Sequence, residues 1–460
     1  MKNIPLVIGA LLFSTLFHKQ GIGLNLSIFS VLSLIILILY NKPAFKQKST
    51  MAYSMLYLIT ATAVFVYNNS LSIIANSVAF FTLVGHVSRQ NTSIYMHWIN
   101  GLYSIIAGFF HRNFNSDEKT VSTESKKEID YLHLSKIIGI PLAVVIIFIS
   151  LYKNGNPMFN DLINRIDFSF INIQWVLVAF CGYYLLSNIS KPVIVDPATT
   201  IDTQTGNNLV KHSDIVVDDL KKEHQFGCIL ISALNALIIL FLITDITYLI
   251  SSTDLRASSF SNQVHSGINA LIASIIIAIV IILYFFRGNL NFYKANKHLK
   301  FVAYTWIILN AILVINIVLK DLQYIYYFGL TYKRIGVIIY LLLTVIGLIT
   351  TFIKVKSIKN FWYLFRINTL TTFSILVVSC TINWDSYITI YNLNYAKSMD
   401  FKYLITLSDN NTFILKHYID NTDLDPSKTA AVNKKYRSYL KSLHNNSWQE
   451  VQFDNLKLKK

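Results

Sequence analysis

Long apolar runs, separated by short polar joints, occupy the chain from Ile4 to Asn383. The clearest runs, residues 226–244 and 267–286, contain no charged residue. A transmembrane helix needs roughly 20 such residues, or about 17 at the low end. We therefore predict an all-α, polytopic transmembrane helix bundle of about 12 spans, within a range of roughly 11 to 13. The predicted spans are residues 4–17, 24–40, 51–67, 71–85, 94–110, 137–152, 171–186, 226–249, 267–286, 301–319, 335–353 and 362–382.

Polar segments divide this pattern into a bundle, residues 1–383, and a C-terminal part, residues 384–460. Residues 112–136 and 187–225 have the composition of mobile polar loops. Residues 155–170 carry apolar side chains on one helical face, which predicts a short helix lying in the membrane interface.

The C-terminal part is predicted to be a small helical hairpin followed by a basic tail. Apolar positions recur at helical spacing up to Leu407, and Asp409 can cap a second helix that includes Leu415. The hairpin is too small to form a core of its own, so we expect it to pack on the last spans. The basic residues Lys434, Lys435, Arg437 and Lys441 are predicted to form a solvated face.

The net charge of +16 changes this picture little, because the Lys and Arg residues are scattered through the joints and the tail. No basic stripe interleaved with aromatic residues is present, so we predict no nucleic-acid partner. Basic joints instead favour the cytoplasmic side of a bilayer.

Three joints compete for that side. They contain Lys42, Lys46 and Lys48; Arg287, Lys294, Lys297 and Lys300; and Lys354, Lys356, Lys359 and Arg366. With 12 full spans they cannot all share one side. Either one early segment does not cross, with 71–85 and 94–110 the weakest spans, or the first joint breaks the rule. The greater weight of the later joints places them inside and the C-terminal tail outside.

Polar groups at bilayer depth are the first place to look for function. Asp245 ends an apolar run, and His265 and Asn269 share a helical face beyond the next joint. Asp245 and His265 could exchange a proton, although headgroup-level residues explain both more simply. His97 and Asn100 belong to a polar stripe with Ser104 and Gly108 that is typical of a helix-packing seam and less often lines a substrate path.

A second candidate lies at the start of the run 335–353. Gly329 allows a left-handed turn and Thr331 can cap the following helix. With Lys333 and Arg334, the same helix start could contact an anion or a partner. The structural interpretation is favoured.

No nucleotide, zinc or hydrolase motif is present, so we predict no catalytic residues, no metal and no cofactor. The cysteines Cys181, Cys228 and Cys380 stand singly, without metal or redox spacing.

Several short motifs nevertheless occur in a distinctive order. They are N-P-M-F-N-D-L-I-N-R-I, N-A-L-I-I-L-F, Y-F-G-L-T-Y-K-R-I, I-N-W-D-S-Y-I-T-I-Y-N-L-N-Y-A and D-F-K-Y-L-I-T-L-S-D-N. In these motifs the chain resembles the bacterial polytopic family filed as domain of unknown function 4153, or its relative 4173. The resemblance implies an integral protein of the bacterial cytoplasmic (inner) membrane and carries no catalytic residues.

Two classes of function remain open. The first is a membrane scaffold or sensor that presents residues 384–460 to a protein partner. The second is a secondary transporter or channel that uses Asp245, His265, His97 and Asn100. An enzyme acting on lipid-linked substrates is the least favoured class.

Overall fold

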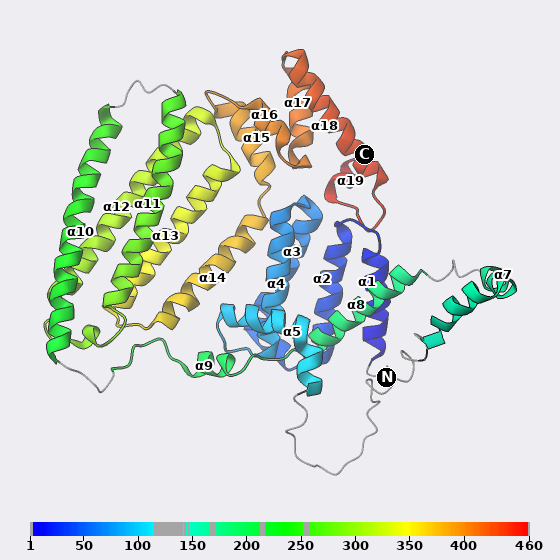
Figure 1. Ribbon diagram of the computed structural model, residues 1–460. Coiled ribbons are helices and arrows are strands. Elements are labelled where there is room, and N and C mark those ends of the chain that lie inside the picture. Colours follow the sequence, from blue (N-terminus) through cyan, green and yellow to red (C-terminus); the bar gives the residue numbers. More distant parts are fainter. Residues whose placement is uncertain are drawn as a thin grey trace, which may run out of the picture. The chain divides into compact units, whose positions relative to one another are not determined.

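The computed structural model describes residues 3–114, 141, 144–145, 147–165, 172–211, 217–251 and 257–458, with the side chains of 114, 162–165, 248–251 and 257–269 outside the description. Over these residues the fold is helical, with an isolated β-bridge between Asn208 and Lys359 and no strand (Figure 1). The predicted all-α membrane fold is confirmed at this level.

Seven helices of the described chain are long and apolar enough to cross a membrane. They are α3 (Lys48–Tyr67), α4 (Ser70–Ser88), α8 (Ile173–Ser190), α10 (Val217–Ser251, apolar over Val217–Thr247), α12 (Lys297–Phe328), α13 (Tyr332–Lys356) and α14 (Phe361–Cys380). Three shorter apolar helices are α1 (Ile4–Phe17), α2 (Leu24–Tyr40) and the part Ala270–Phe285 of α11 (Ala257–Phe285). The predicted span 94–110 lies in α5 (Ile94–Phe114), which is not among the seven, and the predicted span 137–152 lies partly outside the described residues.

The chain divides into two compact units. The first comprises residues 1–18 and 109–187. In it α1 packs on α8, where the Ser14 hydroxyl donates to the Trp175 carbonyl at 2.5 Å. The short helix predicted within residues 155–170 forms as α7 (Pro157–Arg165).

The second unit, residues 19–108 and 188–460, contains two groups of membrane helices. In one group α3 packs on α2 and α4. A side chain at Gly85 or Gly101 would overlap the main chain of the neighbouring helix, so these glycines allow α4 and α5 to cross closely.

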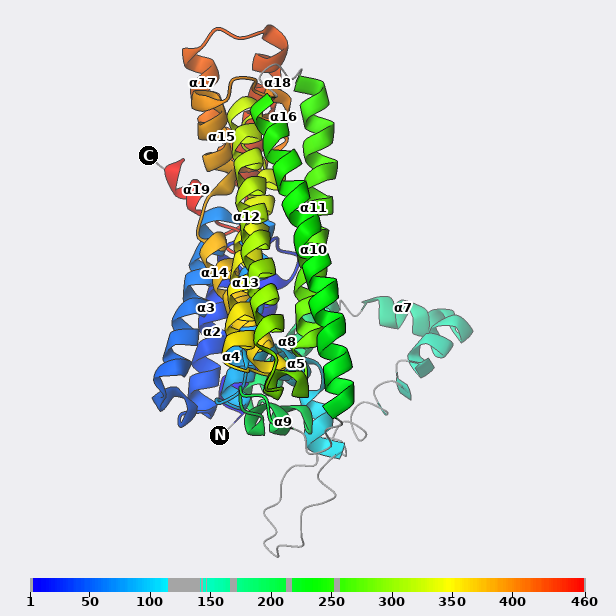
Figure 2. The same cartoon turned by 90° about the vertical axis from the view of Figure 1, so that its left-hand side faces the viewer.

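The other group is formed by α10 to α13, which lie side by side (Figure 2) and share one apolar core. At 1.5 Å per residue the 32-residue α12 is about 48 Å long, whereas the hydrocarbon core of a bilayer is about 30 Å thick. The last turns of α12, where Lys320 and Asp321 follow the apolar run, therefore extend beyond the hydrocarbon.

The C-terminal module, residues 384–457, sits at that end of α12 and α13 (Figure 1). It consists of α15 (Trp384–Tyr395), α16 (Phe401–Thr406), α17 (Thr412–Asn421), α18 (Pro426–Asn445) and α19 (Phe453–Lys457). Its core combines Ile388, Leu404, Leu415 and Val432 with Ile325, Leu330 and Ile335 of the α12–α13 hairpin. The module thus uses the membrane helices to complete its core.

The module is more elaborate than the predicted hairpin. A break at residues 396–400 separates α15 from α16, and Asp409 lies in a 3-10 turn (Asp409–Asn411) without capping α17. Lys435 is also not a solvated residue. Its Nζ donates to the carbonyls of Ile405 (3.1 Å), Leu407 (2.7 Å) and Ser408 (3.1 Å) and to Asn411 Oδ1 (2.9 Å), so it closes the end of α16, where a cation is favourable.

The prediction that residues 187–225 form a polar loop also needs correction. It contains the end of α8, an extended segment, α9 (Ala198–Gln204) and the start of α10. Polar side chains from α5 and α14 hold this segment, and periodicity within the segment itself carries no sign of these contacts.

All three lysine-rich joints of the second unit lie at the end away from the module (Figure 1). The C-terminal end of α3 and the N-terminal end of α13 line one cavity beside the module, so Lys48 and Lys359 belong to the opposite end. Because α12 is antiparallel to α13, Lys297 lies there too. The competition among the joints disappears if α5 is not a full crossing, whereas α4, the other weak span, has the length and composition to cross.

We predict that single cysteines at Lys297 and Lys359 are labelled from the cytoplasm and that one at Lys434 is labelled from the other side, in a background without Cys181, Cys228 and Cys380. The physical reason is the positive-inside preference of the joints. Lys434 is an exposed neighbour of the half-buried Lys435, so its labelling does not disturb the fold. Labelling of Lys434 from the same side as Lys297 would contradict this orientation.

Leu404→Asp is predicted to loosen the module while the membrane helices stay inserted. Leu404 is completely buried, and burial of such a side chain contributes about 1.5–3 kcal/mol. Limited proteolysis of the membrane-embedded protein should cut the module faster. Lys402→Asp, on the exposed side of the same helix, is the control and should leave the cleavage rate unchanged.

Candidate functional site

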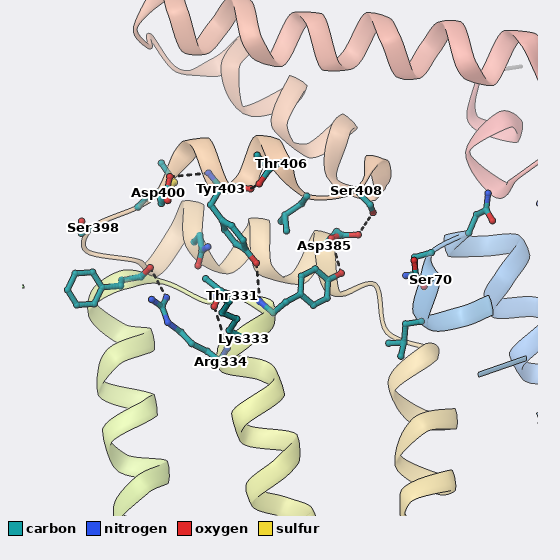
Figure 3. Close-up of a pocket in the computed structure, with 18 residues that line it drawn as sticks. Ser70, Thr331, Lys333, Arg334, Asp385, Ser398, Asp400, Tyr403, Thr406 and Ser408 are labelled. Carbon is teal, nitrogen blue, oxygen red and sulfur yellow. Dashed lines mark hydrogen bonds between the residues drawn. The ribbon is translucent and has the colours of Figure 1, made fainter. Parts of the chain in front are cut away.

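A cavity of about 1140 Å³ lies where the module meets the membrane helices (Figure 3). We call it the module cleft. Its walls are the α3–α4 turn, with Asn68 to Leu71; the α12–α13 turn, with Phe328 and Thr331 to Arg334; and module residues Asp385, Asn392, Ser398 to Asp400, Tyr403 and Thr406 to Ser408. The cleft therefore touches both groups of membrane helices and the module.

The module grips the α12–α13 turn by its main chain. Asn392 of α15 is the central contact, because its Oδ1 accepts from the Leu330 N–H (2.5 Å) and its Nδ2 donates to the Leu330 carbonyl (2.9 Å). The Ser398 N–H donates to the Tyr327 carbonyl at 2.9 Å. Gly329 has a φ of +78°, and a Cβ there would overlap the Asn392 side chain, so only glycine suits this position.

Tyr332 is the second link between α13 and the module. Its hydroxyl donates to Asp385 Oδ1 at 2.9 Å, and its N–H donates to the Tyr403 hydroxyl at 3.0 Å. Asp385 is itself buried and also accepts from the Ser408 hydroxyl. Figure 3 labels Asp385 and Tyr403, the two module residues that Tyr332 contacts.

The predicted anion or partner contacts all line this cleft. Thr331 caps α13, its hydroxyl accepting from the Arg334 N–H at 3.4 Å. The Arg334 guanidinium is buried, lies 4.1 Å from the centre of the Tyr324 ring, and donates to the carbonyls of Phe328 (3.0 Å) and Gly329. Arg334 therefore closes the C-terminal end of α12, and Lys333 is the exposed cation of the pair.

Asp245 has partners on α12. Lys320 Nζ lies 2.5 Å from Asp245 Oδ1, and the Asn316 amide donates to the same carboxylate. This group joins α10 to α12 near the module-side limit of their apolar runs. The side chains of His265 and Asn269, the other predicted members of the site, lie outside the described residues.

His97 and Asn100 lie in a packing seam at the opposite end of the second unit. His97 Nε2 is 3.3 Å from His86 Nδ1, and His86 Nε2 is 3.1 Å from the Thr50 hydroxyl. Asn100 Oδ1 accepts from the Val195 N–H (2.9 Å) and the Thr199 hydroxyl (3.1 Å). Residues 193–199 thus cover the stripe through hydrogen bonds to Asn100 and Ser104.

Asp202 of α9 fastens the same segment and was missed from the sequence. Its carboxylate accepts from the Ser93 N–H (2.8 Å), from the Tyr95 hydroxyl and from Arg366 Nη2 (3.1 Å). Burial by itself would raise the pKa of the Asp202 carboxyl, but these hydrogen bonds lower it more, so the pKa lies below its ordinary value. Arg366 at the start of α14 consequently serves as a clamp.

The residues that grip the turn, Asn392 and Asp385, were also missed as site residues. They lie in the motif I-N-W-D-S-Y-I-T-I-Y-N-L-N-Y-A, and their partners Leu330 and Tyr332 lie in Y-F-G-L-T-Y-K-R-I. The sequence therefore contains both motifs, but neither motif indicates that the two segments contact each other in the fold.

These features define a polytopic helical membrane protein with a C-terminal helical module. The chain belongs to the family described as Domain of unknown function (DUF4153), whose family model matches residues 6–417. No curated protein and no solved structure matched the chain. The matched region includes the α12–α13 turn and α15, so both halves of the grip lie within the family's extent.

Asn392→Leu is predicted to release the α12–α13 turn. It leaves the buried N–H and C=O of Leu330 without their partner, at about 1–3 kcal/mol each. Hydrogen exchange of the Leu330 amide should accelerate and thermal unfolding should begin earlier. Asn394→Leu, an exposed position of the same helix, is the matched control; equal behaviour of the two variants would contradict the grip.

Proposed function

We propose that this protein is a membrane scaffold or sensor in which the module cleft receives a partner. The observation that carries the proposal is the main-chain grip of Asn392 on Leu330. A partner in the cleft would contact the module and the α12–α13 turn at once, so its binding energy could act on the membrane hairpin directly. We further propose the bacterial cytoplasmic membrane as its location, because helical spans suit that membrane and outer-membrane spans are β-barrels.

The composition of the cleft favours a peptide or protein segment as the partner. Exposed Lys333 stands on the α13 wall and exposed Asp400 on the module wall, and apolar contacts come from Leu71, Met399 and Leu407. Charges of both signs with apolar surface between them suit a mixed polypeptide better than an isolated ion.

Site-specific photo-crosslinking tests the proposal in cells that make the full-length protein. A photoreactive residue at Lys333 should yield defined protein adducts, and Ser398→Trp, which fills the cleft, should remove them. Ser442→Trp on exposed α18 is the control and should leave them intact. Adducts that persist after Ser398→Trp, or that arise equally from a photoreactive residue at Ser442, would refute a partner site in the cleft.

A second candidate function, ion-coupled transport, is favoured by the Asp245–Lys320–Asn316 group. An acid–base pair joining two membrane helices is a recurrent element of proton and ion pathways. Proton uptake by proteoliposomes containing the protein, lost in Asp245→Asn and retained in Ser398→Trp, would favour transport over the scaffold or sensor function.

A further inference from the structure

The chain after α18 returns to the membrane helices at a place distant from the grip. Residues 447–451 lie along the turn that precedes α2: the Leu24 N–H donates to the Val451 carbonyl (2.9 Å) and the Asn25 N–H donates to the Gln449 carbonyl (2.8 Å). Gly23 is required for this approach, since a Cβ there would overlap the main chain of Glu450. We call residues 447–457 the strap.

The strap is fixed on its inner side by polar contacts. Tyr439 of α18 donates its hydroxyl to Asp454 Oδ2 (2.7 Å), and the Asn455 amide donates to the Leu443 carbonyl (2.7 Å). The short helix α19 also packs on α3. Asp454 is thus buried, and the neighbouring positions one helical turn apart, Phe453 and Leu456, face outward.

Large apolar side chains occupy this outward side. Trp448 is 55% exposed, Phe453 41% and Leu456 47%. Lys457 Nζ lies 5.3 Å from the centre of the Phe453 ring and pairs with Asp454 Oδ1 at 2.6 Å. Single exposed apolar residues need no explanation, but three within nine positions of the chain form a local apolar patch.

The level of the strap relative to the bilayer follows from α2 and α3. The exposed apolar side chains of α2 begin at Ile28, about one helical turn after the strap contact at Leu24, and continue through Val31 and Ile35. On α3 the exposed apolar side chains Met51, Met55 and Ile59 lie in the half farther from the strap, because the other end, at Asn68, binds the Ile22 carbonyl. The strap therefore lies where the lipid-facing surface of α2 ends, at the depth that Trp and other aromatic residues prefer.

We propose that Trp448, Phe453 and Leu456 insert into the boundary between lipid headgroups and acyl chains, so that the strap is an interfacial anchor of the module. The occupant of this patch is the bilayer itself, because the patch lies beside the end of the lipid-facing surface of α2. This anchor does not depend on a partner in the module cleft. The strap holds the module beside the start of α2 and on α3, whereas the Asn392 grip holds it to α12 and α13.

Depth-dependent fluorescence quenching tests the anchor on the full-length protein in lipid nanodiscs. The emission of Trp448 is the difference between the wild type and Trp448→Phe, since the chain has six tryptophans. Lipids brominated near the headgroup should quench this emission about twofold or more, and aqueous iodide should quench it little, as for an interfacial aromatic residue.

The matched control is Ser427→Trp in the Trp448→Phe background, which places an exposed reporter at the other end of α18. Iodide should quench this reporter and brominated lipids should not. The same pattern for Trp448 would overturn the anchor, and so would protection of Trp448 from both quenchers, because it would show a protein cover in place of lipid. Unchanged thermal unfolding of Trp448→Phe ensures that the difference reports on a folded module.

Discussion

The arrangement of the second unit depends on how the main chain of the α12–α13 turn is satisfied. A tight turn between two long helices leaves carbonyls and N–H groups without partners in either helix. Here the Arg334 guanidinium donates to the last carbonyls of α12, and the Ser398 N–H donates to the Tyr327 carbonyl. The Asn392 side chain hydrogen-bonds both the N–H and the carbonyl of Leu330. Because two of these partners come from the module, the turn is well satisfied only when the module is docked.

The same turn completes the apolar core of the module. Ile325, Leu330 and Ile335 pack among Leu404, Leu415 and Val432. Because residues of the membrane hairpin are part of this core, undocking the module would expose apolar surface on both sides. Docking and folding of the module are therefore coupled, and a change that moves α12 against α13 reaches the module through buried contacts. This coupling is the physical basis for assigning a scaffold or sensor role to the cleft.

Bilayer thickness explains where the polar groups of α10 to α13 stand. These helices exceed the hydrocarbon core, so Asp245 and Lys320 occur near the limit of the apolar runs and pair with each other at 2.5 Å. At the opposite end of these helices lie the lysine-rich joints. There the ion pair between Arg366 and Asp202 fixes α9 to the start of α14. The module is attached to the α12–α13 turn by the Asn392 grip, to the end of α3 by the Asn410 amide on the Tyr67 carbonyl, and to the start of α2 by the strap.

The sequence by itself determined that this protein lies in a lipid bilayer and that it is helical, because apolar runs of bilayer length allow few alternatives. It also indicated that the C-terminal part needs a docking surface. It also located the cap at Thr331 and the glycine at Gly329, since both depend on local backbone geometry. Tertiary structure alone decided what Lys435, Arg366 and Asp202 do, because each side chain binds groups far away in the sequence. The same is true of the pairing of Asn392 with Leu330, because 62 residues separate the two. Only the packing of the module on the α12–α13 hairpin brings the Asn392 amide to the turn, and hydrophobic periodicity does not indicate that these two segments meet.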